Sequence, residues 1–317
     1  MSLCAAMRPA RARMRRGATA ACRSRVRQGR PMSGCGAGAI PALRWSAAMN
    51  DALLRVTGLS VHYPIVRGVL FQRTVGSTVG IEDVSFTVSR REIVGVVGES
   101  GSGKSTLLRT LLLIERPSGG TVEYEGRSLF HATPSEQNEY RRRAQVVFQN
   151  PRSSLDPALR TERSVTEPLA VRGDVPVRSA QGAVTRALAE VGMETTTGDR
   201  FPDQMSGGQQ QRIAIARATV SAPQILYADE CVSALDVSVQ ARVINLLLDL
   251  RDRLGFAMVF VTHDLGVVRA LCDTVLVLQR GRVVEYRPAA DFFSAPTHAY
   301  SRELVDAARA TELEPHR

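Results

Sequence analysis

The residues best suited to chemistry form one short run, Gly98-Glu99-Ser100-Gly101-Ser102-Gly103-Lys104-Ser105-Thr106, which matches the pattern G-x-x-x-x-G-K-[ST]. Its glycines let successive backbone N–H groups turn toward one anion, and a helix starting here adds the positive end of its dipole. Lys104, the only lysine among 41 basic residues, supplies a compact ammonium for the outer phosphates. Ser105 supplies a hydroxyl ligand for Mg²⁺. The run therefore predicts a phosphate-binding loop, or P-loop, for a nucleoside triphosphate.

The segments on either side supply the elements that such a loop needs. An apolar, β-branched run, Ile93-Val94-Gly95-Val96-Val97, precedes the loop and predicts a buried strand. Leu107–Ile114 follows the loop and predicts a buried helix. Strand, glycine loop and helix in this order are the context in which the pattern binds phosphate.

A pair of carboxylates ends another apolar run. The run Ile225-Leu226-Tyr227-Ala228 leads into Asp229 and Glu230, as expected of a buried parallel strand whose last residues reach the carboxyl edge of a sheet. Beside a P-loop, Asp229 is expected to hold Mg²⁺ through water. Glu230 is expected to orient or deprotonate the water that attacks the γ-phosphate.

A second candidate phosphate-binding device is Ser206-Gly207-Gly208-Gln209, directly before a predicted helix through 213–217. It offers a hydroxyl and unobstructed backbone N–H groups at a helix N-terminus. A protein needs two such devices if one nucleotide is gripped from both sides.

The remaining pattern predicts an α/β fold class: a P-loop NTPase core with a parallel sheet, an N-terminal antiparallel β subdomain and an inserted α-helical subdomain. Residues 150–217 form the predicted helical insert, and no internal repeat is visible. Strands are expected at 54–63, 81–88, 120–126 and 144–148, a loop at 64–80, helices near 162–172 and 179–192, and alternating strands and helices up to 285.

Charge is concentrated at the start of the chain. The formal net charge is +10 over 317 residues, yet residues 1–50 contain ten arginines and no acid, so the rest of the chain is balanced. We expect this arginine-rich leader to be disordered. Three interpretations remain open for it: a nucleic-acid-binding or lipid-binding arm, a targeting peptide, and a non-native extension upstream of a true start near Met49. The missing apolar segment after the arginines argues against a targeting peptide, and the non-native extension is the favoured interpretation.

Cysteine usage and hydropathy exclude several classes of protein. The five cysteines include no C-x-x-C pair, which argues against a zinc or iron–sulfur site and against a disulfide framework. No run of about 18 uncharged apolar residues occurs, so no membrane-spanning helix is predicted.

Taken together, these motifs resemble the ATP-binding subunit of ABC transporters, over about residues 53–310. The resemblance implies ATP and Mg²⁺ as cofactors and a head-to-tail dimer that encloses two nucleotides. In it, Ser206–Gln209 is the signature motif, which contacts ATP held by the opposite subunit. Gln149 reaches Mg²⁺ and links the helical insert to the membrane partner, His263 touches the γ-phosphate, Asp236 lies in the D-loop at the dimer interface, and Tyr63 stacks on adenine.

Four segments narrow the resemblance to the oligopeptide and dipeptide importer branch: 147–157, 232–241, the loop at 64–80 and a tail at 292–304. This branch implies a second ATP-binding subunit, identical or paralogous, two membrane-spanning permease subunits, a solute-binding protein outside the membrane, and a peripheral location on the cytoplasmic face. The expected domains are the leader 1–50, an ATPase domain 51–290 and a C-terminal tail 291–317. The solute carried and the preference for ATP over GTP stay open.

One residue departs from the family pattern. Cys231 follows Glu230 where the family usually has proline. Proline would fix φ and remove an N–H group, so cysteine is expected to loosen the turn into the D-loop and to lower turnover.

Two other classes of function compete with transport. A soluble ABC ATPase acting on nucleic acid would predict a second nucleotide domain, a long coiled coil or a zinc hook, and only the leader supports it. A regulatory module that holds ATP without turnover would lack Glu230 or His263, and both are present. No specific nucleic-acid partner is therefore expected.

Overall fold

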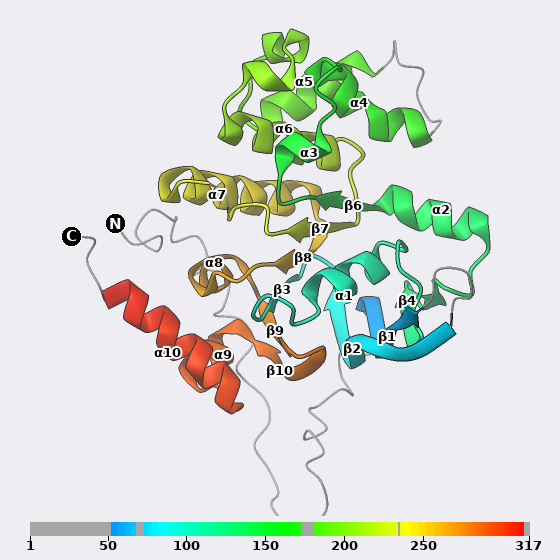
Figure 1. Cartoon of the computed structure of the whole chain (residues 1–317). Coiled ribbons are helices and arrows are strands. Elements are labelled where there is room, and N and C mark those ends of the chain that lie inside the picture. The colour runs from blue at the N-terminus through cyan, green and yellow to red at the C-terminus, as the bar shows by residue number, and fades with distance from the viewer. Residues whose placement is uncertain (1–51, 68–72, 173–179, 234, 314–317) are drawn as a thin grey trace, which may run out of the picture.

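A six-stranded sheet forms the centre of the described residues, in the order β10-β9-β3-β8-β7-β6. The computed structural model describes residues 52–67, 73–172, 180–233 and 235–313 (Figure 1); the predictions on residues 1–50 lie outside them. All neighbouring strands are parallel except β10, which is antiparallel to β9. The strands are β3 (Ile93–Val97), β6 (Ala144–Val147), β7 (Ile225–Asp229), β8 (Ala257–Val261), β9 (Thr274–Gln279) and β10 (Arg282–Pro288).

Both faces of this sheet are buried, which explains why its strands read as unbroken apolar runs. On β7, Leu226 and Ala228 belong to one hydrophobic cluster, and Ile225 and Tyr227 belong to another. The first, the helix-side cluster, includes buried residues of α5 (Gln181–Glu190), α6 (Gly207–Thr219), α7 (Val237–Leu254) and α8 (Leu265–Leu271). The second, the β-side cluster, includes buried residues of α1 (Lys104–Leu111), β1 (Ala52–Arg67), β2 (Arg73–Ser89) and β4 (Gly119–Tyr124).

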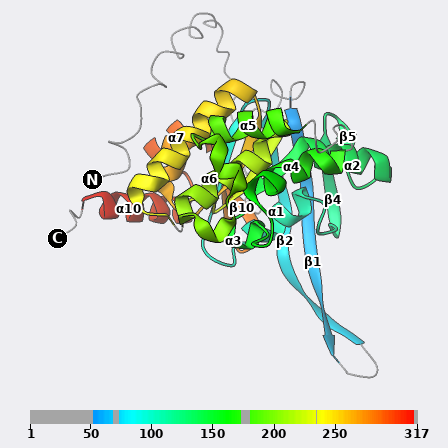
Figure 2. The same cartoon turned by 90° about the horizontal axis from the view of Figure 1, so that it is seen from above.

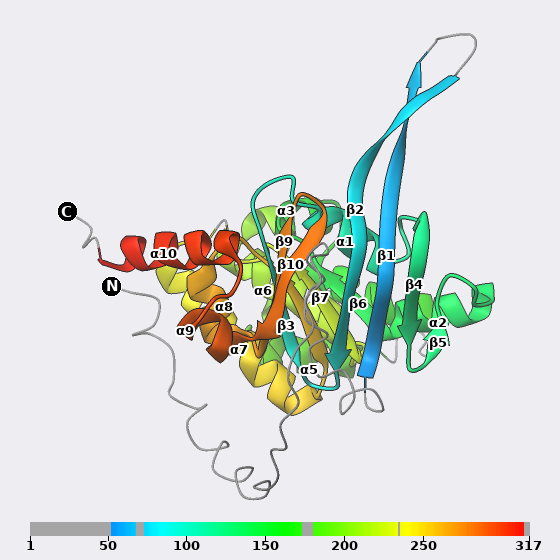
Figure 3. The same cartoon turned by 90° about the horizontal axis from the view of Figure 1, so that it is seen from below.

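A four-stranded antiparallel sheet in the order β2-β1-β4-β5 forms the predicted β subdomain, with β5 at Arg127–Ser128. The expected loop at 64–80 is wrong over most of its length, because β1 continues to Arg67 and β2 begins at Arg73. These strands form a long hairpin that projects from the body (Figures 2 and 3). Pro64 fits because β4 pairs with β1 only as far as Ser60, so the far side of β1 needs no N–H donor there.

The helical insert lies on the opposite side of the central sheet from the β subdomain (Figure 1). The insert follows β6 in the chain. The apolar faces of its helices pack into the helix-side cluster. The segment contains α3 (Pro151–Ser154), α4 (Thr161–Arg172), α5, the 3-10 helices η4 (Thr195–Asp199) and η5 (Pro202–Gln204), and α6; the helix α2 (Pro134–Arg143) precedes β6.

The helix after the P-loop is displaced from its predicted bounds. It begins at Lys104, so the lysine and the two hydroxyl residues after it form its first turn. It ends at Leu111, before Leu113, whose φ of 57° lies in the left-handed region, and Ile114 is 66% exposed. Apolar composition alone did not reveal this turn, because leucine rarely adopts that conformation.

The C-terminal helices α9 (Ala289–Ser294) and α10 (Ala299–Leu313) pack against the body. Phe292, Tyr300 and Val305 belong to the helix-side cluster and are almost fully buried. Within the described ranges, no helix has both the length and the apolar character needed to cross a membrane.

Candidate functional site

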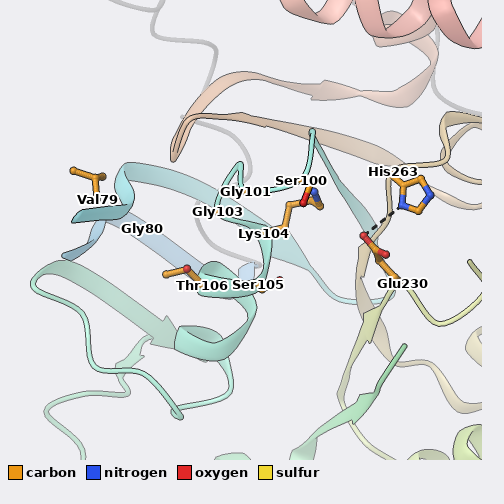
Figure 4. Close-up of a pocket in the computed structure, with 10 residues that line it drawn as sticks. All are labelled: Val79, Gly80, Ser100, Gly101, Gly103, Lys104, Ser105, Thr106, Glu230 and His263. Carbon is orange, nitrogen blue, oxygen red and sulfur yellow. Dashed lines mark ion pairs between the residues drawn. The ribbon is translucent and has the colours of Figure 1, made fainter. Parts of the chain in front are cut away.

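Four strand ends bring the P-loop, Gln149, Glu230 and His263 to one edge of the central sheet. The P-loop follows β3, Gln149 lies two residues beyond β6, Glu230 follows β7, and His263 lies two residues beyond β8. Because these strands are parallel neighbours, their carboxyl ends meet at the same edge. A cavity of about 380 Å³ opens there, lined by Val79, Gly80, Ser100, Gly101, Gly103, Lys104, Ser105, Thr106, Glu230 and His263 (Figure 4).

The three glycines of the P-loop differ in why the structure requires or permits glycine there. Gly98 and Gly103 have φ of 153° and 105°, and a Cβ on them would lie 2.2 Å from the Leu278 carbonyl oxygen and 2.6 Å from that of Gly80. Gly101 also has a positive φ, 77°, but a Cβ on it would meet nothing within 4 Å. The loop is thus tightly held from behind and open at Gly101, toward the cavity that it lines.

The Lys104 side chain is held by hydrogen bonds to the backbone of the P-loop. The side chain is buried, and its Nζ donates hydrogen bonds of 2.7 Å to both the Gly98 and the Glu99 carbonyl oxygens. Burial lowers the pKa of Lys104, while the carboxylates of Glu230, Asp229 and Glu99 act in the opposite direction. An ammonium has three donors, so one remains for a phosphate oxygen.

Glu230 lies at the centre of the polar contacts in the cavity. One carboxylate oxygen accepts a hydrogen bond from Gln149 Nε2 at 3.0 Å, and the other lies 3.4 Å from His263 Nδ1. Its φ of 42° is in the left-handed region, and its N–H donates to the Val261 carbonyl, which fixes the turn at the end of β7. This strained backbone aims the carboxylate into the cavity, with His263 beside it (Figure 4).

The turn that carries His263 is fixed by its neighbour. Asp264 Oδ1 accepts hydrogen bonds from the Gly266 and Val267 amides and so caps α8. Its other oxygen accepts from Gln240 Nε2 at 3.1 Å, which ties this turn to α7.

Asp229 is half-buried at the last position of β7. Burial raises the pKa of its carboxyl, and the negative charge of Glu230 raises it further, whereas Arg109 and Lys104 lower it. Asp229 is not among the residues that line the cavity.

Tyr63 packs against the far end of the site. Its hydroxyl lies 3.4 Å from Thr106 Oγ1, and a Cβ on Gly80 would lie 2.7 Å from its ring. Val79 and Gly80 are not among the predicted site residues, because they fall within the predicted loop at 64–80. Extending the strand alternation from 81–88 back past Gly80 would have found them, because β1 and β2 pair across this region.

The signature residues and Asp236 do not join this cavity. Ser206 caps α6 in a reciprocal capping box, in which its side chain accepts from the Gln209 amide and the Gln209 side chain accepts from the Ser206 amide. Ser206 and Gly207 are exposed, and a Cβ on Gly207 would meet nothing within 4 Å. Asp236 precedes α7 and is exposed, without a side-chain capping hydrogen bond.

The residues at this edge fit a nucleoside triphosphate with Mg²⁺. The open face at Gly101, the free donor of Lys104 and the Ser105 hydroxyl suit phosphate oxygens and a hard cation. The buried Ser102 hydroxyl has no hydrogen-bond partner among the residues that the structure describes. Fold and site together define a nucleotide-binding protein of the P-loop class.

Comparison with known proteins identifies the family. Residues 81–233 match the family described as ABC transporter. The chain is 45% identical over 260 residues to a probable peptide ABC transporter ATP-binding protein of Sinorhizobium fredii, covering 82% of this chain and 73% of that protein. It is 41% identical over 261 residues to the dipeptide transport ATP-binding protein of Escherichia coli, covering 82% and 78%. The chain therefore belongs to the ABC transporter family.

Solved structures agree with the fold. The cbiO1 component of an ABC transporter complex from Clostridium perfringens is 25% identical, with a TM-score of 0.68 over 83% of this chain and 100% of that one. A dimeric ATP-binding cassette bound to ADP and phosphate is 28% identical, with a TM-score of 0.65 over 74% and 98%. The predicted fold class is confirmed, and the chain is an ATP-hydrolysing enzyme that uses ATP and Mg²⁺.

Proposed function

We propose that this chain is the ATP-hydrolysing subunit that powers an importer of oligopeptides or dipeptides. The observation that carries the catalytic part is one cavity lined by Lys104, Glu230 and His263, which come from three neighbouring strand ends. The peptide part is supported by relatives named as peptide and dipeptide transport proteins, of whose length the chain covers 73% to 78%.

The proposed roles follow from the contacts. Glu230 is the general base, because its carboxylate reaches into the cavity while its backbone is fixed at both sides. His263 Nδ1 lies 3.4 Å from that carboxylate and helps to hold it in place. His263 also contacts the γ-phosphate. Gln149 holds Glu230 through its amide at 3.0 Å, and must release it in order to reach Mg²⁺.

The phosphate chain is gripped by the P-loop residues. Gly98, Ser100, Gly101, Ser102 and Gly103 present the loop backbone, and Lys104 neutralises the outer phosphates. Bound Mg²⁺ would neutralise charge on the leaving and transferred phosphates. Ser105, Gln149 and Asp229 would hold that ion, Thr106 closes the cavity beside it, and Tyr63 stacks on the base.

A second ATP-binding subunit, identical or paralogous, completes the site. Ser206, Gly207, Gly208, Gln209 and Asp236 lie away from the cavity of their own chain, and Ser206 and Gly207 are exposed at the N-terminus of a 13-residue helix. An exposed helix N-terminus with a free glycine face suits the phosphates of a nucleotide held by another subunit. The dimeric cassette with ADP and phosphate among the structural neighbours supports this arrangement.

The remaining partners belong to the transporter as a whole. Two membrane-spanning permease subunits receive the motion of the dimer, and a solute-binding protein outside the membrane delivers the peptide. The chain then works as a peripheral protein on the cytoplasmic face. We also propose the division into an ATPase domain, 51–290, and a C-terminal tail, 291–317.

Uptake of a labelled dipeptide by cells tests the transport assignment. Cells without this chain should lose uptake, and the wild-type chain should restore it, whereas Glu230→Gln should not, because an amide cannot accept the proton from water. Glu167→Gln is the matched control: Glu167 is exposed and pairs with Arg217 away from the cavity, so this variant should restore uptake. Uptake that persists without the chain, or that Glu230→Gln restores, would overturn the proposal.

A further inference from the structure

The P-loop is held from behind by residues about 200 positions later in the chain. The Glu99 amide donates a hydrogen bond of 3.0 Å to the Tyr300 hydroxyl, which α10 brings to the loop. The Gly281 amide, between β9 and β10, donates to the Ser102 carbonyl at 2.9 Å. Tyr300 is 4% exposed, and it lies outside the 81–233 segment matched by the family.

One peptide group links Tyr300 to Lys104. The N–H of Glu99 and the C=O of Gly98 belong to the same peptide group, and no cis peptide bond occurs in the described residues. In a trans peptide these two groups point in opposite directions. The N–H donates to the Tyr300 hydroxyl at 3.0 Å and the C=O accepts from Lys104 Nζ at 2.7 Å, so the phenol and the ammonium bind opposite edges of one peptide plane.

This grip decides where the lysine points. Two of the three Lys104 donors are used by the Gly98 and Glu99 carbonyls, and both carbonyls flank the Glu99 N–H that Tyr300 holds. A rotated peptide plane would remove the first of these acceptors and release the ammonium. Gly98 offers little resistance to such a rotation, since glycine has wide backbone freedom.

We propose that Tyr300 is a positioning residue for nucleotide binding, which fixes the Gly98–Glu99 peptide and thereby holds Lys104 with one donor directed at the phosphates. The C-terminal tail is therefore part of the nucleotide site. This inference rests on the proposed role of Lys104.

Tyr300 is itself rigidly anchored. Its ring belongs to the helix-side cluster, and its amide donates to His298 Nδ1 at 3.2 Å at the start of α10. Burial raises the pKa of the phenol, so at neutral pH the hydroxyl is intact and can accept from the amide while donating elsewhere.

The variant Tyr300→Phe removes the acceptor and keeps the buried ring. We expect the KM for ATP and the Kd for ATP to rise about five- to tenfold, because one buried hydrogen bond and its preorganisation are lost, while kcat stays within about twofold. Hydrogen exchange of the Glu99 amide in the nucleotide-free protein should become about tenfold faster.

Tyr286→Phe is the matched control. The Tyr286 hydroxyl is also part-buried and hydrogen-bonded to the backbone, at the Thr87 carbonyl, but it lies on β10 away from the P-loop. It should lower thermal stability as much as Tyr300→Phe does and leave ATP affinity unchanged. Equal ATP affinity in Tyr300→Phe and wild type would overturn the inference.

Two further measurements keep the outcome decisive. If the Glu99 amide of the wild-type full chain exchanges at the rate of an unprotected amide, the inference is wrong whether or not the variant folds. Lys104→Met separates the proposed role of Lys104 from the proposed role of Tyr300. This variant should abolish ATP binding. If ATP binding survives in Lys104→Met, both proposals fail; if Lys104→Met alone loses it, only the role of Tyr300 fails.

Discussion

Single atoms set the shape of the site on the side where Tyr63 lies. Gly80 lines the cavity, and its missing Cβ leaves room for the Tyr63 ring and for Thr106 Cγ2, which a Cβ would approach to 3.0 Å. A Cβ on Gly80 would lie 2.7 Å from Tyr63 Cε2. Because the Tyr63 ring is rigid, the whole ring would have to move.

Gly80→Ala should therefore displace Tyr63 and weaken nucleotide binding. We expect a fall in ATP affinity of about fivefold and a loss of about 1 kcal/mol in the free energy of unfolding, as for other overpacked sites. Titration calorimetry and chemical denaturation measure both. Gly76→Ala on the same strand is the control, because its Cβ would meet only Ile65 Cδ1 at 3.8 Å. Equal losses in the two variants would show that the alanine acts through the strand and not through Tyr63.

At the scale of elements, the turn after β7 connects the catalytic carboxylate to α7. The Ser233 amide donates to the Glu230 carbonyl at 3.1 Å, so Glu230 to Ser233 close a turn with Cys231 at its second position. Cys231 is 1% exposed, and burial raises the pKa of its thiol to about 12, so it packs as a neutral group.

Proline is favoured at the second position of such a turn, which gives a physical reason for the proline that the family resemblance leads one to expect there. Cys231→Pro should raise the free energy of unfolding by about 0.5–1 kcal/mol, by restricting the unfolded chain, and should raise kcat for ATP hydrolysis. Cys231→Ala, which removes the thiol without fixing φ, should leave kcat unchanged. The same steady-state kcat in Cys231→Pro and wild type would show that the cysteine does not loosen the catalytic turn.

A second element, the start of α10, depends on one buried carboxylate. Glu285 on β10 accepts hydrogen bonds from the Thr297 and His298 amides at 3.0 and 3.1 Å and pairs with Arg287. Burial alone would raise the pKa of Glu285, but the Ser301 side chain, these two amides and Arg287 together lower it to about 2, from an ordinary 4.5.

The sign of the pH dependence follows from this depressed pKa. The ionised carboxylate contributes its full stabilisation above the ordinary pKa, and loses it as the pH falls toward the folded-state value. Glu285→Gln should lower the free energy of unfolding near neutral pH by about 2 kcal/mol, since charge-assisted hydrogen bonds are lost. The gap from wild type should narrow below pH 4.5. Exposed Glu303→Gln is the control; a gap that stays constant down to about pH 3 would contradict the assignment.

Sequence reasoning worked best where one strand or loop determines the outcome. The parallel core, the antiparallel β subdomain and the helical insert are confirmed, because apolar runs, alternation and helical spacing each depend on local burial. The strands at 64–67 and 73–80 differ from the predicted loop because Pro64 and Gly76 are normally loop residues. Pro64 fits into β1 only because the side of β1 that faces β4 is unpaired beyond Ser60. Tyr300 could not be found from local pattern, since it acts through the Glu99 amide, which lies 201 residues away in the sequence.

At the scale of the whole molecule, charge separates the leader from the ATPase. All of the formal excess of +10 lies in residues 1–50. A variant without residues 1–48 should keep the ATPase activity of the full chain, because no site residue lies in that segment. The second readout is binding to single-stranded RNA across a salt series. We expect the full chain and the variant to bind RNA equally weakly at every salt concentration. Loss of such binding would favour the nucleic-acid alternative.

Dimerisation is the other property of the whole molecule. The cavity of one chain holds the P-loop, Glu230 and His263 but not Ser206 to Gln209, so one chain contains only half of each proposed site. ATP bound between two chains would hold them together, and hydrolysis would release them.

The most direct test of this account is Mg²⁺-dependent ATP hydrolysis by the full chain and by Glu230→Gln, with size-exclusion chromatography of both in ATP. The wild type should turn over, and the variant should be slower by about a hundredfold or more and elute as an ATP-bound dimer. Glu230→Gln that hydrolyses ATP at the wild-type rate, or that binds ATP and remains a monomer, would contradict the catalytic role of Glu230 or the shared site.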